Sequence, residues 1–185
     1  MKQISIKTST LAANAILGAL VVVFDYTMKF SGFKIPFPWL TTLKFDFTGI
    51  PIVLAFLIYG FSSGSTTSII AFLAILLRSG NFVSASMRGL TEFSQILGMT
   101  IGLKLTGRLG KVMSFVFGIV FRCIIMSVAN IIIFPLIYGM PVESVTSLLP
   151  LIAVFNAAMG VLSMFVGVLL YKTLLRRVPS LFKPQ

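Results

Sequence analysis

The amino-acid sequence predicts an all-α integral membrane protein with six transmembrane helices, folded as a single membrane domain over residues 1–185. Apolar residues make up 57% of the chain and charged residues 10%, and the mean hydropathy is +1.06. Soluble domains carry roughly 45–50% apolar and about 25% charged residues, because water must meet a polar surface. Since one span needs about 20 apolar residues, the chain has room for about six or seven spans and for no soluble domain.

The spans follow from apolar runs that are separated by charged and turn-forming residues. The second and third spans are short and meet at an uncharged Gly-Phe-Ser-Ser-Gly turn, which predicts a tight helical hairpin. The first apolar run has no small-residue cleavage site before Lys29, so we expect a retained helix and not a signal peptide. The six predicted spans cover residues 9–28, 47–61, 64–78, 87–105, 112–138 and 150–172.

Lys and Arg residues set the expected orientation. With the N-terminus inside, nine of them lie in cytoplasmic segments, five lie in outer loops, and Arg122 lies within a span. This moderate positive-inside bias predicts a multi-pass protein of the cell membrane with both termini in the cytoplasm. The basic residues punctuate the apolar runs and form no block, so the net charge of +11 favours lipid headgroups over nucleic acid as counterions.

The residue inventory excludes several classes of chemistry. The sequence contains no His and one Cys, so a tetrahedral zinc site, a Cys/His nucleophile pair and a disulfide all lack their parts. It also contains no P-loop motif, so the chain does not energise transport by that route. We expect no metal, no cofactor and no enzymatic activity, and any transport must draw its energy from another protein.

The first outer segment, residues 29–46, is rich in aromatic residues, and we expect it to lie over the mouth of the helix bundle. Pro36 and Pro38 favour an extended backbone, and the alternation over residues 43–47 predicts a short strand. Trp39 either stacks on a bound molecule or belongs to the aromatic belt at the membrane interface, and the residues alone leave both open.

Polar side chains inside the predicted spans need a reason, because burial in lipid is costly. Glu92 and Gln95 share a face near the outer end of the fourth span, where the alternative is that Glu92 simply pairs with Arg88. Asn130 and Asn156 fall at similar depth in the outer leaflet. Two such amides can bind a ring that carries donors and acceptors, or they can hydrogen-bond to each other between helices.

Other polar or small residues have ordinary structural explanations. Arg122 lies near the midplane of the fifth span, and an internal pairing is favoured over contact with a ligand. Asp46 precedes a helix start with Pro51 in its first turn, and capping alone explains a carboxylate there. Ala15 and Ala19 share one face of the first span, and their spacing alone favours packing inside the bundle.

Several of these segments resemble the S components, the substrate-binding membrane subunits of energy-coupling factor (ECF) vitamin transporters. The run Leu-Lys-Phe-Asp-Phe-Thr-Gly-Ile-Pro over residues 43–51 is similar to their second-helix signature. The likeness is nearest to the riboflavin-specific branch. It continues through Gly-Leu-Thr-Glu-Phe-Ser-Gln at 89–95, Ala129-Asn130 and Phe-Asn-Ala-Ala-Met-Gly at 155–160. Several weak motifs in the right order are more specific than any one of them.

The resemblance implies a high-affinity capture subunit for riboflavin or a related flavin. The alternative ligands are pantothenate, a pyridoxine-like compound or a modified-base precursor, and a non-transport structural protein is a more distant alternative. The implied partners are a membrane coupling subunit and two ABC-type ATPases, which hydrolyse the ATP. The resemblance also implies that Ala15 and Ala19 form a docking patch for the coupling subunit, which reverses the preference for packing inside the bundle.

The resemblance further implies a binding site under the 29–46 segment. Met159 stands where the family has a ligand-facing Lys, and Gln95 stands where Asn is usual, so the motifs specify the transporter class more closely than the ligand. The expected binding residues are Phe37, Trp39, Phe45, Asp46, Glu92, Gln95, Asn130, Asn156 and Met159.

Overall fold

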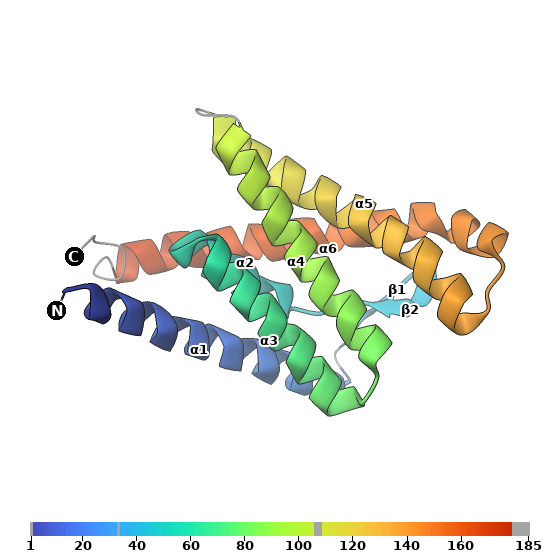
Figure 1. Cartoon of the computed structure of the whole chain (residues 1–185), viewed down its shortest axis with the longest axis horizontal. Coiled ribbons are helices and arrows are strands. Elements are labelled where there is room, and N and C mark those ends of the chain that lie inside the picture. The colour runs from blue at the N-terminus through green and yellow to red at the C-terminus, as the bar shows by residue number, and fades with distance from the viewer. Residues whose placement is uncertain (1, 33, 106–108, 179–185) are drawn as a thin grey trace.

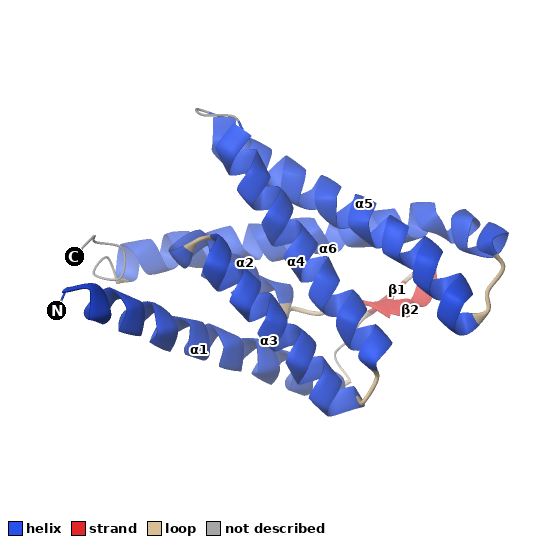
Figure 2. Cartoon of the chain, viewed as in Figure 1, coloured by secondary structure: helices blue, strands red, loops and turns tan. Residues whose placement is uncertain are grey.

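The computed structural model describes residues 2–32, 34–105 and 109–178, most of which are helical, as the composition predicts (Figure 1). A short antiparallel β-hairpin joins the first two helices (Figure 2). The elements in chain order are α1 (Lys2–Phe30), β1 (Pro36–Phe37), β2 (Leu40–Lys44), α2 (Gly49–Tyr59), α3 (Phe61–Ser79), α4 (Phe82–Leu105), α5 (Gly110–Tyr138) and α6 (Val142–Arg177).

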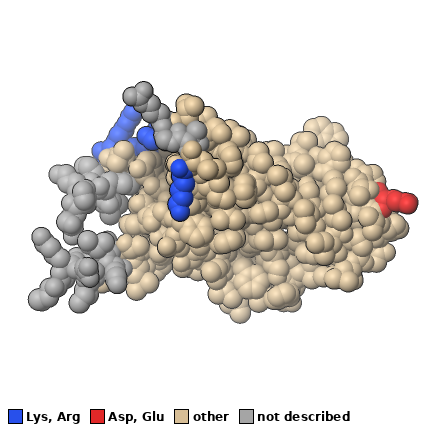
Figure 3. All heavy atoms as spheres, turned by 45° about the horizontal axis from the view of Figure 1, so that its top comes forward, with Lys and Arg blue, Asp and Glu red and all other residues tan. Residues whose placement is uncertain are grey.

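Four of the described helices are long and apolar enough to cross a membrane, namely those that contain Thr10–Phe30, Phe61–Ser79, Gly110–Tyr138 and Val142–Arg177. Helix α2 is apolar but shorter. In the view of Figure 3, charged side chains lie at the ends of the molecule and a broad uncharged band lies between them. This distribution suits a lipid-facing surface. The count of six spans and the cytoplasmic position of the termini stay predictions.

Several boundaries differ from the sequence prediction, among them those of α6 and of the strand. Helix α6 already begins at Val142, directly after Pro141, so much of the segment before residue 150 is helical. The predicted strand over 43–47 lies earlier, at Leu40–Lys44, because its partner is Pro36–Phe37 and the residues after Lys44 lead into α2. The tight α2–α3 hairpin is present, and its junction is Gly60 at φ 82°, a backbone conformation that favours glycine.

Close packing between α4 and α5 positions the later site. A Cβ atom on Gly102 would collide with the carbonyl oxygen of Met113, and one on Gly98 would collide with that of Phe117. Glycine at both positions therefore lets the end of α4 approach the beginning of α5 closely. Toward their other ends the two helices diverge, and the hairpin lies on that side of the bundle, away from the chain termini (Figure 1).

A buried carboxylate links α1, α3 and the first loop near the hairpin end. Asp25 is 1% exposed, and its carboxylate accepts hydrogen bonds from Arg78 Nε at 2.5 Å and from Lys34 Nζ at 3.1 Å. An Asp25 without these cations would carry an uncompensated buried charge. The pairs therefore fix the end of α1 against the end of α3.

Asp25→Asn is expected to lower the free energy of unfolding by roughly 1–3 kcal/mol, because Arg78 and Lys34 lose their shared counterion. Both cations keep some contact with solvent, so the loss is smaller than for a fully buried pair. Thermal unfolding in detergent measures the effect, and Glu143→Gln at an exposed site is the control. Equal melting temperatures for Asp25→Asn and Glu143→Gln would contradict this role.

Candidate functional site

The candidate site is a cavity of about 370 Å³ where α4 and α5 diverge, bounded also by α6 and strand β2. Its volume lies within the range of roughly 300–1,000 Å³ that is typical of small-molecule sites. The lining combines aromatic and aliphatic side chains with several polar ones. The residues are Leu43, Lys44, Val83, Ser84, Met87, Arg88, Thr91, Arg122, Met126, Asn130, Phe134, Tyr138, Ile152, Phe155 and Asn156.

Arg122 lies at the deep side of this cavity and is fully buried. Its Nη1 donates to Gln95 Oε1 at 2.5 Å and to Glu92 Oε1 at 3.3 Å. Its Nε donates to Asn156 Oδ1 at 3.4 Å. The internal pairing that the sequence favoured for Arg122 is therefore confirmed, and in addition the side chain lines the cavity.

Arg88 joins the same cluster from the hairpin side. Its Nη2 contacts the Asp46 carboxylate and lies 3.1 Å from Glu92 Oε1, so the predicted Arg88–Glu92 pair forms as one part of a larger network. The Glu92 carboxylate oxygen Oε1 thus serves both guanidinium groups, one from its own helix and Arg122 from α5. The cluster ties α4, α5 and the hairpin connection together.

Asp46 connects the hairpin to the start of α2. Its Oδ1 accepts hydrogen bonds from the Thr48 backbone N–H at 3.2 Å and from Thr48 Oγ1 at 2.7 Å. Thr48 is itself the N-cap residue of α2 and the helix has no side-chain capping bond, so the predicted capping role of Asp46 is replaced by a contact with the residue that begins the helix. Burial by itself raises the pKa of Asp46, but Arg88, the Thr48 hydrogen bonds and Lys34 together hold it below its ordinary value. The carboxylate therefore stays ionised and keeps Arg88 beside the cavity.

Several buried polar atoms of the cluster have no hydrogen-bond partner among the described residues. They include Arg88 Nε, Glu92 Oε2, Gln95 Nε2 and Arg122 Nη2. An unsatisfied buried polar group costs about 1–3 kcal/mol, and most such groups in folded proteins are paired. Two of these four atoms belong to residues that line the cavity, so the cluster is suited to hydrogen-bond a polar molecule there. The described residues contain no group of three His, Cys, Asp or Glu side chains that could hold a metal ion.

The two asparagines predicted at matched depth line this one cavity. Asn130 Nδ2 donates to the Met126 carbonyl at 2.6 Å, and Asn156 Nδ2 donates to the Ile152 carbonyl at 2.9 Å, each within its own helix. Among the described residues, neither amide bonds to the other. Both amides therefore line the cavity from different helices, and their binding role stays a prediction.

The aromatic residues of the first loop lie in two different places. Phe37 is buried, with ring centroids 5.5 Å from Phe155 and 6.0 Å from Phe45, and Met159 packs into the same apolar cluster. Trp39 is 68% exposed at the turn of the hairpin and touches only the edge of this cluster, at 5.1 Å from Phe37. Phe37, Phe45 and Met159 therefore pack with Phe155, which lines the cavity. Trp39 lies outside this lining, and its two alternative roles stay predictions.

Sequence reasoning missed most of the α5 wall, although a signal was present. Met126, Phe134 and Tyr138 continue the same stripe as the two polar positions of α5, at intervals of four residues from 122 to 138. Residues at such intervals share one face of a helix. Arg88 and Lys44 were also missed as cavity residues. The sequence explained Arg88 equally well by pairing with Glu92, and Lys44 by exposure in a loop.

Ala15 and Ala19, the predicted docking patch, are both exposed on α1. The buried face of this helix carries Leu17, Gly18 and Val21 instead. The alternative that the two alanines pack inside the bundle is therefore wrong for this chain on its own, and their role in docking stays a prediction.

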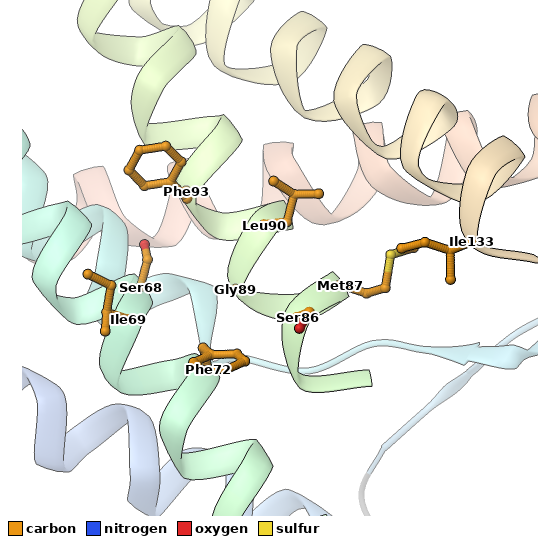
Figure 4. Close-up of a pocket in the computed structure, with 9 residues that line it drawn as sticks. All are labelled: Ser68, Ile69, Phe72, Ser86, Met87, Gly89, Leu90, Phe93 and Ile133. Carbon is orange, nitrogen blue, oxygen red and sulfur yellow. The ribbon is translucent and has the colours of Figure 1, made fainter. Parts of the chain in front are cut away.

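A second hollow, of about 460 Å³, lies between α3, α4 and α5. Figure 4 shows its lining, in which Phe72, Leu90 and Phe93 are prominent and no side chain is charged. Ser68 and Ser86 are its only polar side chains, and the Ser68 hydroxyl already donates to the Gly64 carbonyl. Such a surface can accommodate a lipid acyl chain but cannot orient a polar molecule, so the cavity at Arg122 is the stronger candidate.

Most of the chain is similar to a solved structure of the S component of a bacterial ECF transporter. The TM-score is 0.76 at 23% sequence identity, and the alignment covers 92% of this chain and 97% of that chain. This chain has the fold of an S component. The likeness at this identity establishes the fold that the motifs implied. No protein-family model matches the chain, and no curated protein sequence does so either.

Asn130→Leu and Asn156→Leu are each expected to weaken ligand binding by roughly 1–3 kcal/mol, because a buried polar group of the ligand loses its partner. Calorimetric titration of the purified variants measures the change. Asn130→Leu is the cleaner test, since the Asn130 amide donates to the Met126 carbonyl within α5 and thermal unfolding should change little. Unchanged affinity in both variants would assign the amides a structural role only.

Proposed function

We propose that this protein is the substrate-capture subunit of an ECF-type importer and binds a small vitamin-like molecule in the cavity at Arg122. One observation carries the proposal: Arg88 and Arg122, which line a cavity of mixed polar and apolar character in an S-component fold, each have a buried N–H group without a partner among the described residues. A protein that used this cluster for structure alone would leave fewer donors unsatisfied.

Capture in this proposal uses the hairpin end of the bundle. The ligand lies between α4, α5 and α6, with β2 over it, and the apolar wall around Phe155 supplies contact area. The protein is not an enzyme and needs no cofactor. A membrane coupling subunit and two ABC-type ATPases supply the energy for transport. The cell membrane is its location, with the hairpin on the outer side.

The ligand has two candidate classes. The motif likeness favours riboflavin or a related flavin, for which the two amides would bind the ring edge. The charged lining favours a vitamin that carries an acid group, of which pantothenate is an example among the alternatives. The fluorescence of Trp39, the one Trp of the chain, distinguishes the two classes. A bound flavin accepts excitation energy from this ring, whereas a vitamin that does not absorb at its emission wavelength leaves the energy in place.

The direct test is to purify the protein from membranes, extract any small molecule bound to it and identify that molecule by mass spectrometry. We expect one dominant water-soluble molecule, near equimolar with the protein, that also raises the melting temperature when it is added back. A yellow, fluorescent extract would identify a flavin. If no extracted or added small molecule binds, the capture function is refuted in favour of a structural role in the membrane.

Ala15→Trp and Ala19→Trp are expected to separate binding from transport. Both residues are exposed on α1, away from the cavity between α4, α5 and α6, so a large side chain should block a coupling helix and leave ligand binding unchanged. The measurement is uptake in proteoliposomes that contain the coupling module, beside binding to the purified variants.

Leu20→Trp is the matched control for this experiment, because Leu20 is 36% exposed, already large and lies about 100° or more around the helix from both alanines. Normal uptake by both alanine variants would place the docking surface elsewhere. Loss of binding as well as uptake would show that the substitutions disturb the bundle itself.

A further inference from the structure

We propose that the molecule bound in this cavity carries a carboxylate group, held by Arg122 and Arg88 inside and by Lys44 at the opening. This inference rests on the proposed capture function and adds the chemical class of the substrate. It is carried by the charges of the lining, by the unpartnered atoms and by the surroundings of the opening.

The lining of the cavity is charged with one sign only. Lys44, Arg88 and Arg122 line it, and no Asp or Glu does so. Asp46 and Glu92 lie behind the two guanidinium groups, outside the lining. A ligand in the cavity therefore meets the cations first, and a positively charged group on the ligand would be repelled.

The donors that remain free also match an acceptor. Arg88 Nε and Arg122 Nη2 are the unpartnered buried atoms of the lining, and both are N–H donors of a permanently charged guanidinium. A carboxylate accepts such donors through two oxygens, and charge-assisted hydrogen bonds are stronger than neutral ones. A ligand carbonyl could accept one of them but would leave the positive charge uncompensated.

The charge balance indicates a monoanion. The three cations of the lining, Arg88, Arg122 and Lys44, outnumber by one the two carboxylates that pair with the guanidinium groups, Asp46 and Glu92. Among the described residues Lys44 forms no ion pair, and its side chain is exposed. One carboxylate neutralises this excess, whereas a doubly charged phosphate monoester would reverse it in a poorly solvated site.

The approach to the cavity is basic as well. A neighbouring cavity of about 400 Å³ shares Lys44 and Ser84 with the first and is also lined by Lys29, Lys34 and Arg78. Asp46 is its one acidic lining residue. A cleft with this excess of positive charge raises the local concentration of anions and speeds their arrival.

The test compares pairs of vitamins that differ only at the acid group: nicotinic acid with nicotinamide, biotin with biotinamide, and pantothenic acid with pantothenol. Riboflavin serves as the neutral flavin. For the purified protein we expect one acid to raise the melting temperature and its neutral partner to bind roughly ten- to one-hundredfold more weakly.

The variants assign the preference to the proposed cations. Lys44→Gln, at an exposed position, and Arg122→Gln should both reduce the difference in affinity between an acid and its neutral partner. Arg122→Lys should retain part of this difference. Lys172→Gln, at an exposed site on α6 outside the cavity lining, removes the same charge and should change nothing. Lys44→Gln keeps the test decisive if the Arg122 variants do not fold.

Each outcome supports or overturns the inference. Equal affinity for an acid and its neutral partner, or tight binding of riboflavin that ignores Lys44→Gln, overturns the carboxylate and leaves the capture function standing. Stabilisation by added phosphatidylglycerol but by no vitamin assigns the cations to a lipid headgroup and overturns it too. If no vitamin of the panel binds, the molecule extracted from the protein purified from membranes decides: a carboxylate on it supports the inference, and its absence overturns the inference. If no molecule is extracted at all, the capture function is refuted as well.

Discussion

The Glu92 carboxylate is the centre on which the arrangement of the hairpin end depends. One of its oxygens lies 3.1 Å from Arg88 Nη2 and 3.3 Å from Arg122 Nη1, so a single acid holds a cation of its own helix and one from α5. Arg88 then extends the network to Asp46 and so to the hairpin connection. In an apolar interior each of these charges is tolerable only with the others in place, which couples the positions of three elements.

The cavity exists because of a contrast along one pair of helices. Gly98 and Gly102 allow α4 to touch the backbone of α5, whereas the opposite ends of both helices are separated by long cationic and aromatic side chains. The cationic side chains between the diverging ends, Arg88 and Arg122, line the cavity that results. Small residues at one end and charged residues at the other thus produce both the shape and the chemistry of the site.

The sequence predicted the helical class and most helix positions, because apolar runs and turn residues are local signals. The sequence alone could not identify the residues that pair with Arg122, because Glu92, Gln95 and Asn156 are far from it in the chain. The exposure of Trp39 was equally inaccessible, because a two-stranded hairpin turns this ring outward while Phe37 turns inward. The early start of α6 was hidden by a segment whose polar residues are also typical of a loop.

Met159 packs among Phe37 and Phe155, while the guanidinium of Arg122 crosses from α5 to lie against Gly160 of α6, where an added Cβ would be 3.5 Å from the Arg122 Cδ. In the proposed site, Arg122 of the fifth helix supplies the positive charge that the family resemblance expects from the position of Met159 in the sixth. Moving a charge between neighbouring helices redirects its hydrogen bonds without any change of backbone. Under the proposed function, an S-component fold can therefore change the charge that it presents to its cavity by exchanging side chains between neighbouring helices.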